Sequence, residues 1–411
     1  MDPKKNTIAP LYLLGAFDRF NYGDLIFPIV VKNELFKYGF PESVDVHALI
    51  ETDLSHFGAL PTKSIRTLYN NARLNCGGTI IFAGGGTVGV DWKYMYSNLV
   101  GNFGNSTLYY ASRVFGSKII NWYCRSVLGG KSLFPWVAEP LDFPGIINVA
   151  YNAIGGSELN SLSTETKIKI FDRLSKATYL SVRDAETKKV FLPLIDRITV
   201  ELAPDSAVIM SEQFPISWLK GQITNSLNEL VTGAPYMCFQ CNLTYATRHE
   251  DEIVKVIEQV YRNQGLRTLL LPIGRYVGLD DQVGLRNICK RVKTPIALIS
   301  DEATIWEIMY VIACSNLFLG TSLHGNITSQ SFAIPHLGLS DRPCKLDYYL
   351  DTWDLPEQSR CATLASLNEA IYKVLNLSEM ALVLKRDELI GLVRQNFQKM
   401  FSACKLNNFI T

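Results

Sequence analysis

Short apolar runs that end in Gly, Asn or Asp alternate along the chain with longer segments whose apolar residues recur at helical spacing. Such apolar runs are typical of strands buried in a parallel sheet, and the longer segments predict the helices that connect them. In the first half, strands are predicted at 11–14, 44–48, 79–83, 119–122, 146–149, 179–182 and 198–201, with helices including 25–38, 64–73 and 164–177. This pattern predicts a doubly wound α/β domain.

The second half repeats the alternation. Strands are predicted at 236–240, 268–271, 296–299, 317–319 and 336–339, with helices at 251–263, 282–291 and 303–313. We therefore expect a Rossmann-like N-terminal domain (1–211), a linker (212–234), a Rossmann-like C-terminal domain (235–366) and terminal helices (367–411), some of which pack back on the first domain. Two such domains facing a cleft place a ligand where the strand C-terminal ends meet.

Composition narrows the class of protein. A chain of 411 residues with 47% hydrophobic residues is long enough for two cores. The net charge of +1 gives no global field, so we expect no nucleic-acid partner. The start lacks a secretory pattern and no apolar run reaches the roughly 18 residues of a membrane span, which favours a cytoplasmic protein.

The cysteines and histidines do not predict a metal site. Nine cysteines without regular spacing favour reduced thiols over a disulfide framework. Cys238 and Cys241 form a lone CxxC in an apolar run, with no second pair of ligands nearby. The five histidines are dispersed, so we expect no bound metal.

The segment Gly320-Thr321-Ser322-Leu323-His324-Gly325 carries the strongest chemical signal. It follows the predicted strand 317–319 and opens a helix, so backbone N–H groups and the positive helix end face whatever binds there. A histidine in this position can exchange protons near neutral pH. The alternative is an ordinary strand-to-helix turn with a half-buried histidine.

Two strand ends of the first domain add polar and flexible positions. After the first strand, Asn21 and Gly23 permit a close approach to a ligand, and Asp24 is placed to cap the following helix. After strand 79–83, Gly85 and Gly86 belong to a run of three glycines that matches neither a Walker loop nor the dinucleotide fingerprint.

Arginines follow a strand end in each domain. Arg183 lies in Ser181-Val182-Arg183-Asp184, and Arg275 follows Leu271-Pro272-Ile273-Gly274. Arginines from opposite domains could clamp a doubly anionic ligand. The alternative for Arg183 is a structural ion pair with Asp184.

Taken in order, these strand-end motifs resemble those of the polysaccharide pyruvyl transferase family. The matching segments are Asn21-Tyr22-Gly23-Asp24, Gly84-Gly85-Gly86, Ser181-Val182-Arg183-Asp184, Pro204-Asp205 and Leu323-His324-Gly325 followed by Ile334-Pro335. The resemblance spans about residues 11 to 340. It implies two domains similar to GT-B glycosyltransferases, and transfer of pyruvate from phosphoenolpyruvate onto a sugar diol as a cyclic ketal, with release of phosphate.

The resemblance also implies roles for residues and partners. Arg183 would bind an anionic group of the donor, and His324 would be the general acid or base. We group the remaining candidates as donor contacts (Thr321, Ser322, Gly325, Arg275) and acceptor or loop contacts (Asn21, Gly23, Asp24, Gly85, Gly86). Phosphoenolpyruvate would be the co-substrate with no further cofactor. The acceptor would be a cell-envelope carbohydrate, free or lipid-linked, and a lipid-linked one would bring the enzyme to the inner membrane face.

One position departs from the family pattern. The family often has an arginine two positions before the histidine, where this chain has Ser322. Arg275, Arg342 or Lys345 could supply the missing charge. Two other functions stay open: a GT-B glycosyltransferase that uses a nucleotide sugar, and a non-catalytic carbohydrate-binding protein. The paired glutamates usual in such glycosyltransferases are not obvious, although Glu302 and Glu307 lie on the predicted helix before the His324 strand.

Overall fold

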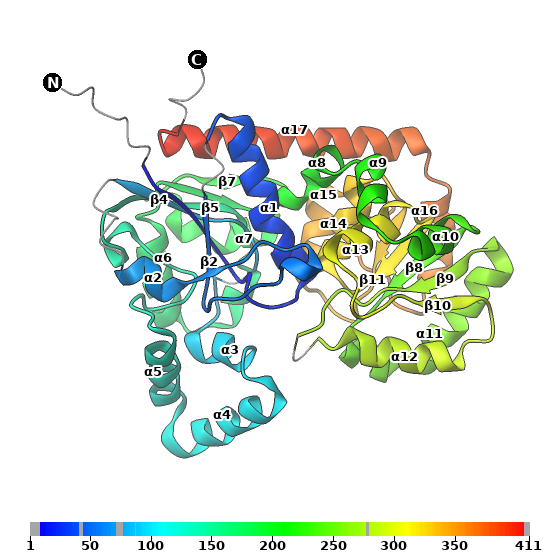
Figure 1. Cartoon of the computed structure of the whole chain (residues 1–411), viewed down its shortest axis with the longest axis horizontal. Helices are drawn as coiled ribbons and strands as arrows, with labels where there is room; N and C mark the ends of the chain where they lie inside the picture. The colour runs from blue at the N-terminus through cyan, green and yellow to red at the C-terminus, as the bar shows by residue number, and fades with distance from the viewer. Residues whose placement is uncertain (1–8, 41–43, 71–76, 87, 277–278, 407–411) are drawn as a thin grey trace.

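The structure is a computed structural model that describes residues 9–40, 44–70, 77–86, 88–276 and 279–406. It contains two parallel sheets, one in each half of the molecule, and a long C-terminal helix that runs along both halves (Figure 1). The predicted fold class, α/β with two doubly wound domains, is confirmed.

The N-terminal sheet has the order β3-β2-β1-β4-β5-β6-β7 with all pairs parallel. Its strands are β1 (Leu11–Leu14), β2 (Asp45–Ala48), β3 (Lys63–Ser64), β4 (Gly78–Phe82), β5 (Ile146–Ile154), β6 (Tyr179–Val182) and β7 (Val200–Leu202). Chain order reverses between β1 and β4, and such a switch point opens a crevice at the strand C-terminal ends.

The C-terminal sheet follows the same plan in five strands, ordered β10-β9-β8-β11-β12. They are β8 (Tyr236–Gln240), β9 (Arg267–Leu270), β10 (Ile296–Leu298), β11 (Leu317–Gly320) and β12 (His336–Gly338). The switch point lies between β8 and β11, so the segment that carries His324 starts at this crevice.

Helices connect the strands and cover both faces of each sheet (Figure 1). In the N-terminal half they are α1 (Tyr22–Lys37), α2 (Ile65–Asn70), α3 (Trp92–Ser97), α4 (Gly101–Phe115), α5 (Ser117–Leu128), α6 (Thr164–Leu174) and α7 (Ala185–Val190). Those that follow are α8 (Met210–Gln213), α9 (Ile216–Leu219), α10 (Asn225–Thr232), α11 (Leu243–Gln264), α12 (Asp281–Arg291), α13 (Ile305–Ala313), α14 (Leu323–Ser331), α15 (Lys345–Trp353), α16 (Leu367–Leu375) and α17 (Glu379–Ala403). No helix in the described part of the chain combines the length and apolarity that a bilayer-spanning segment needs.

One predicted strand is wrong. Residues 119–122 lie in α5, where Ile120, Cys124 and Leu128 are buried at helical spacing. The side chains of Ile119 and Trp122 instead face solvent, with exposed fractions of 58% and 65%. The segment Ile119-Ile120-Asn121-Trp122, with three apolar residues in four, therefore resembled a strand because α5 carries apolar side chains on two faces. The short edge strand β3 was missed, and residues 71–73 of a predicted helix lie outside the described residues.

The predicted linker 212–234 is made of short packed helices. The rings of Phe214 and Trp218 pack against Trp306 of α13, with centroid separations of 4.9 and 5.0 Å. This segment is thereby anchored to the C-terminal domain. One buried apolar cluster, which includes Ile26, Val208 and Ile327, continues across both domains.

Helix α17 ties the end of the chain to the N-terminal sheet. It contacts β5 and β6, and it also contacts α14 of the other domain. Its buried Asn396 accepts a hydrogen bond from Tyr179 Oη at 2.7 Å and donates one to Asn152 Oδ1 at 2.6 Å. Each of these groups is buried, so each depends on its partner in place of water.

We predict that Asn396→Ala lowers the free energy of unfolding by about 2 kcal/mol, because two buried polar groups lose their partner. Guanidinium denaturation followed by circular dichroism measures the change. The matched control is Gln398→Ala on the exposed face of the same helix, which should have little effect. Equal losses in the two variants would contradict this role of Asn396.

Candidate active site

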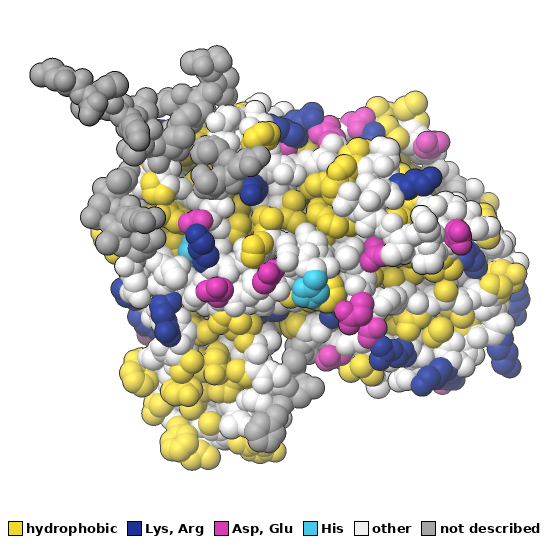
Figure 2. All heavy atoms as spheres, viewed as in Figure 1, with side chains coloured by type: hydrophobic (Ala, Val, Ile, Leu, Met, Phe, Trp, Pro, Cys, Tyr) yellow, Lys and Arg dark blue, Asp and Glu magenta, His cyan; other side chains and the backbone are white. Residues whose placement is uncertain are grey.

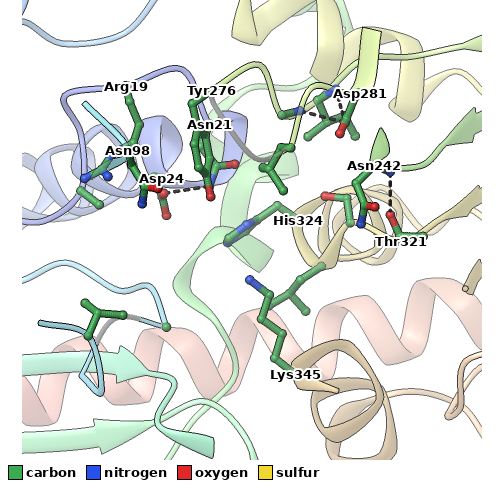
Figure 3. A pocket seen from close by; sticks show the side chains of 18 of the residues that line it. Arg19, Asn21, Asp24, Asn98, Asn242, Tyr276, Asp281, Thr321, His324 and Lys345 are labelled. Carbon is green, nitrogen blue, oxygen red and sulfur yellow. Dashed lines mark hydrogen bonds between the residues drawn. The ribbon is translucent and has the colours of Figure 1, made fainter. Parts of the chain in front are cut away.

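A cavity of about 290 Å³ lies between the domains, at the C-terminal ends of both sets of strands. Side chains of both charges line it. The N-terminal domain contributes Arg19, Asn21, Asp24, Gly86, Glu158 and Arg183. The C-terminal domain contributes Gln240, Asn242, Asp281, Thr321, Ser322, His324 and Lys345. Figure 3 shows His324 near the centre, with the Lys345 side chain extending toward it.

His324 lies in the first turn of α14 and is buried. The ring packs so closely on α1 that a Cβ at Gly23 would lie 1.8 Å from His324 Nδ1. Phe27 contacts the ring edge-to-face, with centroids 5.1 Å apart. Gly23 is therefore required by the position of the histidine, although it does not line the cavity itself.

The electrostatic setting keeps His324 neutral. Burial lowers its pKa well below the usual value, and the charges of Arg183 and Lys345 lower it further. Its Nε2 atom lies 3.8 Å from Asp205 Oδ2 and makes no hydrogen bond with the described residues. A ring nitrogen in this state is available to a ligand in the cavity.

Arg183 follows β6 and is almost completely buried beside the cavity. Its Nη1 donates to Asp205 Oδ2 at 3.3 Å. A Cβ at Gly86 or Gly155 would come within 2.9 Å of Nη2, so glycines make room for the guanidinium. The predicted alternative, an ion pair with Asp184, is wrong in its partner: Asp184 caps α7 through the N–H of Thr187.

Asn21 and Asp24 lie together on the N-terminal side of the cavity. Asn21 Nδ2 donates to Asp24 Oδ2 at 2.8 Å. Asp24 sits inside the first turn of α1, and Asn21 occupies the N-cap position, so the predicted capping role of Asp24 is wrong. Burial raises the pKa of Asp24, and the charges of Arg19 and Lys345 oppose this rise. A carboxylate in this state can accept a proton from a hydroxyl.

The prediction missed a polar network on the C-terminal side. Gln240, at the end of β8, accepts the Ser322 N–H at 2.9 Å and donates to Asp281 Oδ2 at 2.8 Å. The same carboxylate oxygen accepts the N–H groups of Ile273 and Gly274 at 3.0 and 2.9 Å. Burial raises the pKa of Asp281 to about 6. Gln240 ends the predicted strand 236–240, which is the signal that would have found it, whereas Asp281 begins α12 and carries no such signal.

The donor contacts predicted on α14 have mixed outcomes. Thr321 and Ser322 line the cavity, but Gly325 does not. Ser322 Oγ caps α14 by accepting the Gly325 N–H at 3.2 Å. On the other side, Gly86 lines the cavity, whereas Gly85 does not.

Of the three cations considered as replacements for the missing arginine, the structure brings Lys345 to the cavity. Arg275 is placed elsewhere: its guanidinium stacks 3.9 Å from the ring centroid of Phe20 and donates to the Ala303 carbonyl. The prediction that Arg275 contacts the donor is therefore not supported by its position. Arg342 is exposed and does not line the cavity. Lys345 makes no ion pair with any residue that the structure describes.

The two thiols of the CxxC motif offer little to a metal ion. Burial raises the pKa of Cys238 and of Cys241, which leaves both thiols protonated. Elsewhere, ligand atoms of Cys344, Asp347 and Cys361 lie within 4.8 Å of one another. However, the Asp347 carboxylate accepts the backbone N–H groups of both cysteines, at 3.2 and 3.0 Å, and so acts as a capping group of α15.

We predict that Lys345→Met raises the pKa of His324, because the charge of Lys345 lowers it. The measurement is an NMR titration of the histidine ring protons, with the His324 signal assigned from its loss in His324→Gln. Lys373→Met, which removes a cation from α16 outside the cavity, is the control and should leave the titration unchanged. An unshifted signal in Lys345→Met would show that the two groups do not interact.

Comparisons with known proteins identify the family and the fold of this chain. The sequence model of the polysaccharide pyruvyl transferase family matches residues 21–342. No curated protein sequence gives a match. Among solved structures, UDP-GlcNAc 2-epimerase of Neisseria meningitidis bound to UDP-GlcNAc is similar, at a TM-score of 0.50 and 10% identity, over 95% of this chain and 100% of that chain.

Two further structures show the same architecture. The UDP-GlcNAc 2-epimerase of Methanocaldococcus jannaschii in complex with UDP-GlcNAc and UDP gives a TM-score of 0.51 at 11% identity, over 90% of this chain and 94% of that chain. S. aureus MnaA with UDP gives 0.53 at 9% identity, over 98% and 95% of the two chains. The chain therefore belongs to the polysaccharide pyruvyl transferase family, and it is a transferase with the two-domain GT-B fold.

Proposed function

We propose that this protein transfers the pyruvyl group of phosphoenolpyruvate to a sugar of a polysaccharide or of its precursor, as a ketal. The observation that carries the proposal is a buried His324, whose Nε2 has no hydrogen-bond partner among the described residues, in a cavity that the cations Arg183 and Lys345 also line. Phosphoenolpyruvate carries a phosphate and a carboxylate on one small carbon frame. Two separate cations suit these two anionic groups.

The donor's phosphate would bind on the C-terminal side of the cavity. Thr321 and Ser322 lie there at the N-terminus of α14, where the helix end favours an anion. Lys345, an exposed residue at the start of α15, supplies a positive charge to the same cavity. Arg183 then faces the donor's carboxylate from the other domain.

Ketal formation begins with a proton delivered to the methylene carbon of the donor. The neighbouring carbon becomes an oxocarbenium-like centre, which one sugar hydroxyl attacks while losing its proton. The second hydroxyl then attacks the same carbon, the bond from that carbon to the phosphate oxygen breaks, and the hydroxyl proton leaves with the phosphate as the ring closes. His324 is the group placed to deliver the first proton, and Asp24 is placed to receive one from the acceptor.

The bound donor itself would prepare His324 for this step. In the free protein, burial and two cations lower the histidine's pKa. Negative charge on the donor would offset those cations and raise the pKa, so the ring would take up a proton when the donor binds. The site would then hold an acid only when there is a substrate to protonate.

The proposed function predicts, first, how the donor binds. Calorimetric titration should show saturable binding of phosphoenolpyruvate, weakened at least about tenfold in Lys345→Met through loss of a charge-assisted contact. The matched control is Lys373→Met, which removes a cation outside the cavity. Arg183→Ala should also weaken binding, with circular dichroism reporting whether the variant is folded. Absence of binding to the wild-type protein would contradict the donor assignment.

The second prediction concerns the proton. His324→Gln should lower kcat by about two to four orders of magnitude, the usual contribution of a general acid or base. In the wild-type enzyme, kcat should fall as pH rises through the pKa of His324 in the complex. That pKa should exceed the one measured by NMR in the free protein, because the donor is anionic. Coincident values, or an unchanged kcat in His324→Gln, would argue against this role.

The rival function is a glycosyltransferase with a nucleotide-sugar donor. The similar structures that hold UDP favour this alternative, since they share the fold. However, Glu302 and Glu307 do not line the cavity, and Glu307 forms the capping box of α13 with Thr304. Calorimetric titration with a panel of UDP-sugars separates the two: tight binding of one of them, without binding of phosphoenolpyruvate, would favour the rival.

A further inference from the structure

Helices α3, α4 and α5 form a lobe that extends from the N-terminal domain, and we call residues 92–128 the helical lobe (Figure 1). Large apolar side chains cover its outer surface (Figure 2). The most exposed are Tyr109, Tyr110, Val114, Phe115, Ile119 and Trp122, each with more than half of its surface accessible. We call these six residues the aromatic patch. An apolar patch of this kind marks an interaction surface.

The sequence of α5 shows that this exposure is a feature of the helix and does not come from a missing core contact. Ile120, Cys124 and Leu128 already bury one face of α5 in the apolar core of the N-terminal domain. Ile119 and Trp122 lie on the opposite face, which carries a second apolar stripe. An ordinary surface helix has one apolar face, which packs on the core, and a polar face toward solvent. The second apolar stripe of α5 therefore indicates a further binding partner.

The segment that carries the aromatic patch contains basic residues and no acidic ones. One acidic residue from outside the segment, Glu165 of α6, lies close enough to Lys118 for that charge to help lower the pKa of Glu165. Between Asp91 and Glu139 the chain contains no acidic residue, while Lys93, Arg113, Lys118, Arg125 and Lys131 carry positive charge. The whole protein is nearly neutral at +1, so this segment stands apart from the rest. A surface with exposed apolar side chains and basic residues is complementary to an apolar layer whose boundary is negatively charged.

We propose that the helical lobe docks on an anionic lipid bilayer, with the aromatic patch inserted at the level of the headgroups. Trp and Tyr side chains favour this interface because an apolar ring and a polar tip can both be satisfied there. The basic residues would face lipid phosphates, and each lysine or arginine near an anionic surface adds to binding. Arg113, whose guanidinium also lies 5.0 Å from the Tyr109 ring centroid, and Lys118 lie beside the patch.

A second copy of the chain fits this surface less well. A symmetric dimer would place the same patch of each copy against the other. The basic residues of the two lobes would then approach one another with no carboxylate from this segment to offset them. A bilayer with acidic headgroups supplies the missing charge.

The lobe is continuous with the candidate active site. Tyr94, Met95 and Asn98, in or directly after α3, line the cavity, and α3 packs against both α4 and α5. A docked lobe would therefore hold the N-terminal, acceptor side of the cavity near the membrane surface. This consequence rests on the proposed function and fits a lipid-linked sugar acceptor, whereas docking itself is measured without any activity.

The test is cosedimentation of the full-length protein with vesicles of phosphatidylcholine alone or mixed equally with phosphatidylglycerol. We expect binding to the mixed vesicles and weak binding to phosphatidylcholine. Phe115→Ser/Trp122→Ser should weaken binding at least about tenfold, because two large apolar side chains leave the interface. The matched control, Tyr372→Ser/Met380→Ser, changes equally exposed residues on α16 and α17 and should bind like the wild type.

A second variant separates the electrostatic contribution. Arg113→Gln/Lys118→Gln should weaken binding to the mixed vesicles, and added salt should reduce the difference from the wild type. Circular dichroism and phosphoenolpyruvate titration show whether each variant keeps its fold and its site. Wild-type protein that stays in the supernatant with both kinds of vesicle would overturn the proposal. Self-association of the wild-type protein in sedimentation velocity, if it disappeared in Phe115→Ser/Trp122→Ser, would also overturn the proposal.

Discussion

The contact between Gly23 and the imidazole of His324 is the constraint on which the site depends. The two residues belong to different domains, and any side chain at position 23 would occupy the space of the ring. Neighbouring contacts also join the two domains: Tyr22 Oη of α1 lies 3.0 Å from Thr328 Oγ1 of α14, and Asn21 forms an isolated β-bridge with Gly274 in the loop after β9. The histidine is thus positioned by the domain interface as much as by its own helix.

This position also explains the electrostatics of the histidine. His324 and His336 are both buried, yet their pKa values shift in opposite directions. Burial would lower both, but the Asp354 carboxylate lies 2.8 Å from His336 Nε2 and raises its pKa. For His324 the nearest carboxylate, Asp205, is 3.8 Å away and accepts a hydrogen bond from Arg183. The arginine thereby removes the partner that would have kept His324 charged.

The sequence was informative where one local rule decides the structure. Apolar runs between helical segments predicted both sheets, because strands buried on two faces need no alternation of polar residues. The rule that ligands bind at strand ends led to His324, Arg183 and Asp24, all of which line the cavity. The rule that short apolar runs are strands failed for α5, because some of the apolar residues of this helix face solvent.

Side-chain direction was harder to predict than position along the chain. Arg275 follows a strand end as Arg183 does, but the ring of Phe20 and the Ala303 carbonyl hold its guanidinium away from the cavity. No sequence rule links Arg275 to Phe20, since they are brought together only when the two domains meet. Gln240 and Asp281 were missed for a related reason: their importance lies in a hydrogen bond between the end of β8 and the start of α12.

The serine at position 322 shows how the site distributes its charge. Ser322 caps α14 with its hydroxyl, and its N–H is held by Gln240, so the turn is ordered without an arginine. A cation is nevertheless present, because Lys345 reaches the cavity from the first residue of α15. An ammonium on a flexible stem differs from a guanidinium, since it acts as a mobile point charge with no fixed fork of donors. Besides Arg19, which is paired with Asp18, the cavity is therefore lined by one rigid cation, Arg183, and one adjustable cation, Lys345, which come from opposite domains.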